Sequence, residues 1–201
     1  MNLVSGINDL KLVELTGQTL LYAATRAGGG ILALELDGGM SAVDQEQLAP
    51  GLSLPAPASL DILAFNGGQH LVVAGANLAG VQSRALLPDG SFAAVVQLSG
   101  SLSGTIAAQA VVTVASATYF YAARMGESTI HAFAVESNGS MSLIGTSALD
   151  GPLSGIDISA LVPVTVAGQP FLISLSLKAD VLRAFPIGPG GVIGRAEMLG
   201  A

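Results

Sequence analysis

The sequence predicts an all-β protein, a β-propeller of four four-stranded blades, and this prediction rests on three observations. A unit of about 50 residues recurs four times along the 201-residue chain. Each unit contains four short apolar runs separated by glycine-rich turns. The second run of each unit is apolar on both sides of the expected strand. Four short strands in a repeat of this length are the signature of a propeller blade.

Three sequence markers keep one register through the four units. The first is an apolar run, the second is a mixed apolar and polar run, and the third is a turn. The first marker covers residues 18–24, 69–74, 117–123 and 169–174. The second covers residues 31–36, 81–87, 130–135 and 181–187, and the third covers residues 37–39, 88–90, 137–139 and 188–191. The second marker starts at intervals of 50, 49 and 51 residues. We therefore expect one propeller domain with blades at residues 7–57, 58–105, 106–154 and 155–201.

The second unit shows how the four strands of a blade are predicted. Its apolar runs cover residues 60–65, 71–76, 80–87 and 92–98. The intervening Asn66-Gly67 and Asp89-Gly90 pairs supply the positive φ angles that tight hairpins need. The run from Leu71 to Ala74 is apolar on both faces, as expected for a blade covered by a neighbour on each side. No stretch has a sustained period of 3.6 residues, so we predict no helix.

Closure of the ring has two alternatives. The four blades either close on themselves, at the lower end of the propeller range, or form half of a larger ring. Another copy of the chain, or residues outside this sequence, would complete the larger ring. An open half exposes an apolar sheet face at each end, which soluble proteins avoid. We favour the larger ring, with a homodimer as one way to complete it.

Composition excludes several classes of protein. Apolar residues make up 51% of the chain and charged residues 10%, which excludes a disordered chain. The net charge is −7 with only two lysines, Lys11 and Lys178, so we expect neither nucleic acid nor an anionic membrane as partner. The stretch of lowest charge, Ser91 to Ala123, is broken by polar residues, and we expect no membrane insertion. The absence of cysteine excludes disulfides, thiolate zinc sites and cysteine nucleophiles.

The repeat resembles that of lactonase-like propellers. An aromatic-aliphatic strand, a short turn, a second apolar strand and an Asp/Asn-Gly turn follow one another most clearly in residues 22–39 and 121–139. The acidic, cysteine-free, alanine- and glycine-rich composition also looks like the propeller regions of secreted hemolysin-type (RTX) bacterial proteins, although the calcium-binding nonapeptide of those proteins does not occur here. This second resemblance implies a secreted or cell-surface protein without a cleaved signal peptide. The start, Met1 to Gly6, has no signal-like segment.

No catalytic motif, phosphate loop or dinucleotide fingerprint occurs in the sequence. The two histidines, His70 and His131, occupy different positions of the repeat, so we expect no metal site and no resident cofactor. One set of polar residues shares a predicted place at the mouth of the central channel, either near the start of the first strand of a unit or just after its second strand. The first group is Asp9, Asp61, Gln109 and Asp157, and the second is Arg26, Asn77, Arg124 and Lys178.

Two functions are compatible with this ring of polar residues. It can hold a polar ligand or a cation, or its members can cap turns and pair with one another. We expect a non-enzymatic binding or scaffolding propeller that contacts protein or glycan through one loop face. The alternative is a lactonase-like hydrolase that uses the channel-mouth carboxylates with calcium or another divalent cation.

Overall fold

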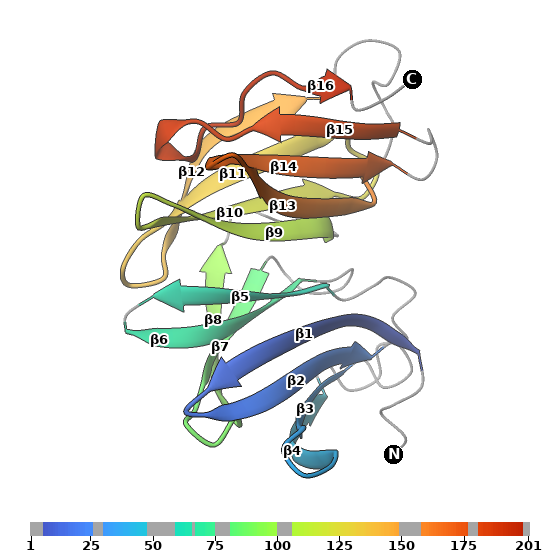
Figure 1. Cartoon of the computed structure of the whole chain (residues 1–201), viewed down its shortest axis with the longest axis vertical. Coiled ribbons are helices and arrows are strands. Elements are labelled where there is room, and N and C mark those ends of the chain that lie inside the picture. Colours follow the sequence, from blue (N-terminus) through green and yellow to red (C-terminus); the bar gives the residue numbers. More distant parts are fainter. Residues whose placement is uncertain are drawn as a thin grey trace. The chain divides into compact units, whose positions relative to one another are not determined.

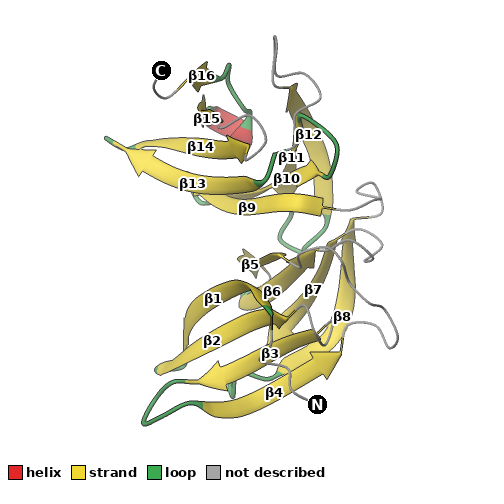
Figure 2. Cartoon of the chain, turned by 90° about the vertical axis from the view of Figure 1, so that its right-hand side faces the viewer, coloured by secondary structure: helices red, strands yellow, loops and turns green. Residues whose placement is uncertain are grey.

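The computed structural model describes residues 6–25, 30–47, 59–65, 67–74, 81–99, 106–148, 158–176 and 181–198. These residues form four four-stranded antiparallel sheets, and in every sheet the strands lie side by side in chain order (Figure 1, Figure 2). This is the blade topology of a β-propeller, and the predicted fold class is confirmed. None of the described residues belongs to a helix of the length and apolarity needed to span a bilayer.

The chain divides into two compact units, Met1–Thr105 and Ile106–Ala201, with two blades in each. The strands of the first unit are β1 (Ile7–Leu15), β2 (Gln18–Thr25), β3 (Gly30–Glu35), β4 (Ser41–Gln47), β5 (Ser59–Phe65), β6 (Gly68–Ala74), β7 (Val81–Leu86) and β8 (Phe92–Ser99). Those of the second are β9 (Ile106–Val114), β10 (Ala117–Arg124), β11 (Thr129–Val135), β12 (Met141–Ala148), β13 (Ala160–Val166), β14 (Gln169–Ser176), β15 (Val181–Pro186) and β16 (Glu197–Met198).

The hairpins at the first strand of each blade are tight. Leu15 pairs with Gln18, so only Thr16 and Gly17 make the turn between β1 and β2, and both have positive φ. The same two-residue geometry recurs at Ala115 and Ser116, where the φ angles are 48° and 72°. Two consecutive positive φ angles match the right-handed twist of the flanking strands, which explains why such turns join them.

The fourth blade departs from the predicted regularity. Instead of a simple turn, Pro189–Gly191 form a single 3-10 turn, although the sequence predicted no helix. The last strand, β16, has two residues, whereas the last strand of the third blade, β12, has eight. The Gly-Pro-Gly-Gly segment at this place favours a compact turn over an extended strand, because proline fixes φ and lacks an amide hydrogen.

Each unit has its own core between its two blades. In the first unit, Leu20, Tyr22 and Ile31 of the first blade pack with Leu71 and Val73 of the second. In the second unit, Tyr121 and Ile130 pack with Leu172, Phe185 and Ile187. One face of the middle strands of each blade therefore contributes to a core. The run from Leu71 to Ala74, for which the sequence predicted covered faces on both sides, is completely buried.

A buried tyrosine links the two blades within each unit. The hydroxyl group of Tyr22 donates to the carbonyl oxygen of Gly90 at 3.0 Å, and that of Tyr121 donates to the carbonyl oxygen of Gly191 at 2.8 Å. Both glycines have positive φ and pack against the neighbouring blade, Gly90 on the Leu20 side chain and Gly191 on the Tyr119 ring. Burial, aided by the nearby Asp89 and Asp44 carboxylates, raises the pKa of Tyr22 to about 12, so this hydroxyl stays a donor at neutral pH.

We predict that Tyr22→Phe and Tyr121→Phe each lower the free energy of unfolding by about 1–2 kcal/mol, because each leaves a buried carbonyl without its donor. Urea denaturation measures the change. Tyr119→Phe is the control, since no hydrogen bond of the Tyr119 hydroxyl group is found within the described residues, and its ring packs on Gly191. A loss of the same size in Tyr119→Phe would contradict a specific role for the Tyr22 and Tyr121 hydroxyl groups.

Candidate functional site

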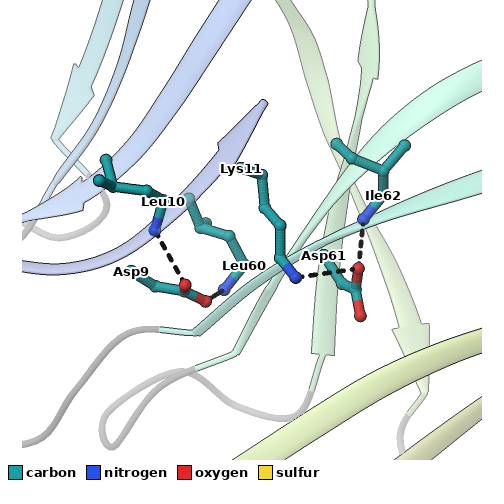
Figure 3. Close-up of polar contacts among 6 residues, drawn as sticks. All are labelled: Asp9, Leu10, Lys11, Leu60, Asp61 and Ile62. Carbon is teal, nitrogen blue, oxygen red and sulfur yellow. Dashed lines mark hydrogen bonds and ion pairs between the residues drawn. The ribbon is translucent and has the colours of Figure 1, made fainter. Parts of the chain in front are cut away.

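The first strand of each blade in the first unit has an aspartate near its start. Asp9 in β1 uses both carboxylate oxygens on backbone amides (Figure 3). Its Oδ1 accepts the N–H of Leu10 at 2.8 Å, and its Oδ2 accepts the N–H of Leu60 in β5 at 2.7 Å. A register shift between Ile7 and Asp9 bends this end of β1. The Asp9 side chain therefore joins the first strand of one blade to the first strand of the next.

Asp61 in β5 is engaged in a similar way. Its Oδ1 accepts the N–H of Ile62 at 2.9 Å and lies 3.4 Å from Nζ of Lys11 (Figure 3). The Asp61 side chain is 16% exposed and that of Lys11 is 35% exposed, so water partly screens the ion pair. Lys11 was not among the predicted site residues. Its position two residues after Asp9 in an alternating strand was the available signal, because such residues share a face.

Gln109 and Arg124 lie in the third blade, in the second unit. Gln109 is buried in β9 opposite Ala122, and Arg124 is the last residue of β10. Nη1 of Arg124 lies 3.3 Å from Oε1 of Glu127, whose other oxygen lies 3.3 Å from Nε2 of His131. Glu127, which the sequence did not single out, therefore bridges a predicted site residue and one of the two histidines. The side chains of Arg124, Glu127 and His131 therefore meet at the β10–β11 loop.

The remaining four predicted site residues are Asp157, Arg26, Asn77 and Lys178, and they lie outside the described residues. Within the described residues, Asp9, Lys11 and Asp61 are brought together in the first unit, and Gln109 and Arg124 lie on neighbouring strands of the second. The prediction that these residues bind a ligand stays a prediction.

No group of three or more histidine, aspartate and glutamate side chains in the described part of the chain is placed to hold a metal ion. His70 lies in β6, where burial lowers its pKa, and His131 lies in β11. The carboxylates of Asp9, Asp61 and Asp44 in the first unit accept hydrogen bonds from backbone amides. Asp44 in β4 repeats the geometry of Asp9, with Oδ1 accepting the N–H of Gln45 at 2.8 Å and Oδ2 accepting that of Phe92 in β8 at 2.9 Å.

The geometry defines a β-propeller whose described aspartates bind backbone amides within and between blades. No protein-family model matches the sequence, and no curated protein matches it. Solved structures share the fold. An exo-β-1,3-galactanase from Phanerochaete chrysosporium superposes with a TM-score of 0.63 at 10% identity over 94% of this chain and 49% of its own.

Two further structures have a similar degree of likeness. The periplasmic gluconolactonase of Pseudomonas aeruginosa gives a TM-score of 0.60 at 15% identity, covering 89% of this chain and 53% of its own. The xyloglucan PUL protein GH43B of Bacteroides ovatus gives 0.64 at 10% identity, covering 100% and 42%. The chain thus spans about half the length of the structures it matches. At these identities the likeness concerns the fold.

We predict that Asp9→Ala lowers the free energy of unfolding by about 2 kcal/mol, because hydrogen bonds to a charged acceptor stabilise more than neutral ones and two amides lose theirs. Equilibrium denaturation in urea measures the change. Glu14→Ala is the matched control on the same strand, since among the described residues the Glu14 carboxylate accepts a hydrogen bond from Thr19 of its own blade and from no other residue. Equal losses in the two variants would show that the link between blades adds nothing.

Proposed function

We propose that this chain is a non-enzymatic binding or scaffolding propeller that contacts protein or glycan through the loops at the edge where β1 and β5 begin. One observation carries the proposal: the described channel-mouth carboxylates, Asp9 and Asp61, are engaged by backbone amides and by Lys11. A carboxylate that holds the backbone in this way supports the blades. Catalysis by a bound metal needs several oxygen ligands that converge on one point.

The same proposal includes the location of the protein. We propose a secreted or surface-associated bacterial protein, as the resemblance to propeller regions of hemolysin-type proteins implies. The acidic, alanine- and glycine-rich, cysteine-free composition is what carries that resemblance.

The alternative function is a lactonase-like hydrolase that depends on a divalent cation such as calcium. The observation that favours it is the shared fold with a gluconolactonase and with an exo-β-1,3-galactanase. Because a propeller hosts many unrelated functions, this likeness raises the alternative without identifying any catalytic residue.

Hydrolysis of D-glucono-lactone separates the two functions. We expect the rate with the purified chain to equal the spontaneous rate, with and without added calcium, and we expect Asp61→Asn to leave it unchanged. A pH-stat follows the acid released. A calcium-dependent rate that Asp61→Asn abolishes would overturn the binding proposal in favour of the hydrolase.

We also propose a second copy of the chain as a partner that completes a larger ring. Leu10 and Leu12 on β1 are 46% and 61% exposed, and they alternate with Val13, which belongs to the core of the first unit. Val162 and Val166 on β13 are 50% and 60% exposed, and they lie on the opposite face of the strand from Leu161, which belongs to the core of the second unit. Apolar faces of this kind are normally covered in soluble proteins.

Light scattering is the test of this assembly. We expect a mass of about 40 kDa in solution, twice the 20.0 kDa of one chain. The double variant Leu12→Lys with Val162→Lys is expected to give the mass of one chain, because each lysine places a charge in the buried contact. A mass of 20.0 kDa for the native chain would instead support a closed four-bladed ring.

A further inference from the structure

A hollow of about 550 Å³ lies between the two blades of the first unit, where the β1–β2 and β5–β6 hairpins turn. In an antiparallel blade this edge is opposite to the one where β1 and β5 begin. Its walls come from three neighbouring turns. Leu15 and Thr16 belong to the first blade, Ala64 and Gln69 to the β5–β6 hairpin, and Leu86 and Pro88 to the end of β7 and its turn. A hollow of this volume falls in the usual range for sites of small ligands.

The walls of the hollow define the chemistry of what fits it. No charged side chain is among its lining residues, so a charged group would find no partner of opposite charge there. Leu15, Leu86 and Pro88 offer an aliphatic surface. The lining residues include no aromatic ring. The hollow therefore favours an uncharged ligand with an aliphatic group.

The polar side chain of the hollow is Gln69. It pairs with Ala64 across the β5–β6 hairpin, so both side chains project from the same face of the blade. Oε1 of Gln69 is buried and accepts no hydrogen bond from any part of the chain that the structure describes. The counterpart in the first blade, Gln18, donates through Nε2 to Oε1 of Glu35 at 3.1 Å. The donor nitrogen of Gln18 is thus used within the fold, whereas the acceptor oxygen of Gln69 has no donor among the described residues.

Thr16 belongs to the part of the hollow that the first blade lines. Its φ of 52° lies in the left-handed region, where a β-branched residue is an outlier. The Thr16 hydroxyl donates to the carbonyl oxygen of Pro88 at 2.8 Å and so ties the turn of the first blade to a turn of the second. The corresponding turns of the second unit have Ala115 and Ala167 at this place, which cannot make such a bond.

We propose that this hollow binds a short uncharged peptide segment, which places an aliphatic side chain against Leu15 and Leu86 and donates a backbone N–H to Oε1 of Gln69. The amide group rotates readily about its terminal bond, so its oxygen can turn toward the donor. A peptide needs one apolar slot and one backbone partner, whereas a sugar brings several hydroxyl groups that a single amide cannot satisfy. This site goes beyond the proposed function, which concerns the opposite edge of the blades.

The test is a titration of the ¹⁵N-labelled full chain with the capped tripeptide acetyl-Ala-Leu-Ala-amide, followed by amide NMR shifts. We expect saturable shifts at Gly67, Gly68 and Gln69, and none of comparable affinity with acetyl-Ala-Asp-Ala-amide. Ala64→Phe, which fills the hollow from an exposed position, is expected to abolish binding. Gln69→Met keeps the shape of the side chain without its amide and is expected to weaken binding about tenfold.

Gln18→Met is the matched control in the neighbouring blade. It should leave the affinity for the peptide unchanged but lower the midpoint of thermal unfolding, because Glu35 loses its donor. Gln69→Met should have the reverse pattern, since it removes a buried acceptor that has no donor in the described fold. A specific role for the amide is refuted by equal affinities of Gln69→Met and the native chain.

Two other outcomes overturn the proposal. Absence of shifts at the hollow with the leucine peptide would do so, as would equal binding of the aspartate peptide. Shifts of the same signals with maltotriose and not with the peptide would assign the hollow to glycan. These readouts do not depend on lactone hydrolysis, so failure here leaves the proposed function of the opposite edge standing.

Discussion

The blades of each unit depend on hydrogen bonds that run from side chains of one blade to the backbone of the next. Hydrophobic packing brings two sheets together, but it is non-directional and would allow them to slide. In the first unit four side chains of the first blade remove that freedom. Their bonds are Asp9 to the Leu60 amide, Thr16 to the Pro88 carbonyl, Tyr22 to the Gly90 carbonyl and Asp44 to the Phe92 amide. They extend from the innermost strand to the outermost, so the whole width of the blade is held in register.

These hydrogen bonds to the backbone explain where several of the few charged and polar side chains of the first unit lie. Asp9 and Asp61, which the sequence predicted at the mouth of a channel, accept hydrogen bonds from backbone amides in the first unit. Among the described residues, the groups left with unused hydrogen-bonding capacity include Oε1 of Gln69, in a hollow at the other edge of the blades. The two edges therefore differ in character. The edge where β1 and β5 begin carries charged side chains that serve the fold, whereas the hollow at the other edge is lined by uncharged residues.

The sequence was sufficient for the fold, because the repeat period and the Asp-Gly and Asn-Gly turns depend on residues close together in the chain. It was not sufficient for contacts between blades, which join residues about 50 positions apart and use backbone atoms that carry no sequence signature. Lys11 and Asp44 were missed for this reason, because their partners lie in the next blade. Glu127 was missed although its partners, Arg124 and His131, are three and four residues away in the chain. The complete burial of Arg84 in β7 was also unexpected, since arginine is among the residues most often exposed. The short β16 follows from a glycine-rich turn whose conformation local rules do not fix.

The hydrogen bonds that run from side chains of the first blade to the backbone of the second are chemically one-sided. The first blade must supply a carboxylate or a hydroxyl group, but Leu60, Pro88 and Phe92 of the second contribute only an amide hydrogen or a carbonyl oxygen. Almost any residue offers these atoms, so substitutions at such positions leave the hydrogen bonds intact. Substitutions are consequently tolerated in the second blade, which supplies backbone atoms, and restricted in the first blade, which supplies side chains. Repeats linked in this way can diverge widely in sequence while their architecture persists.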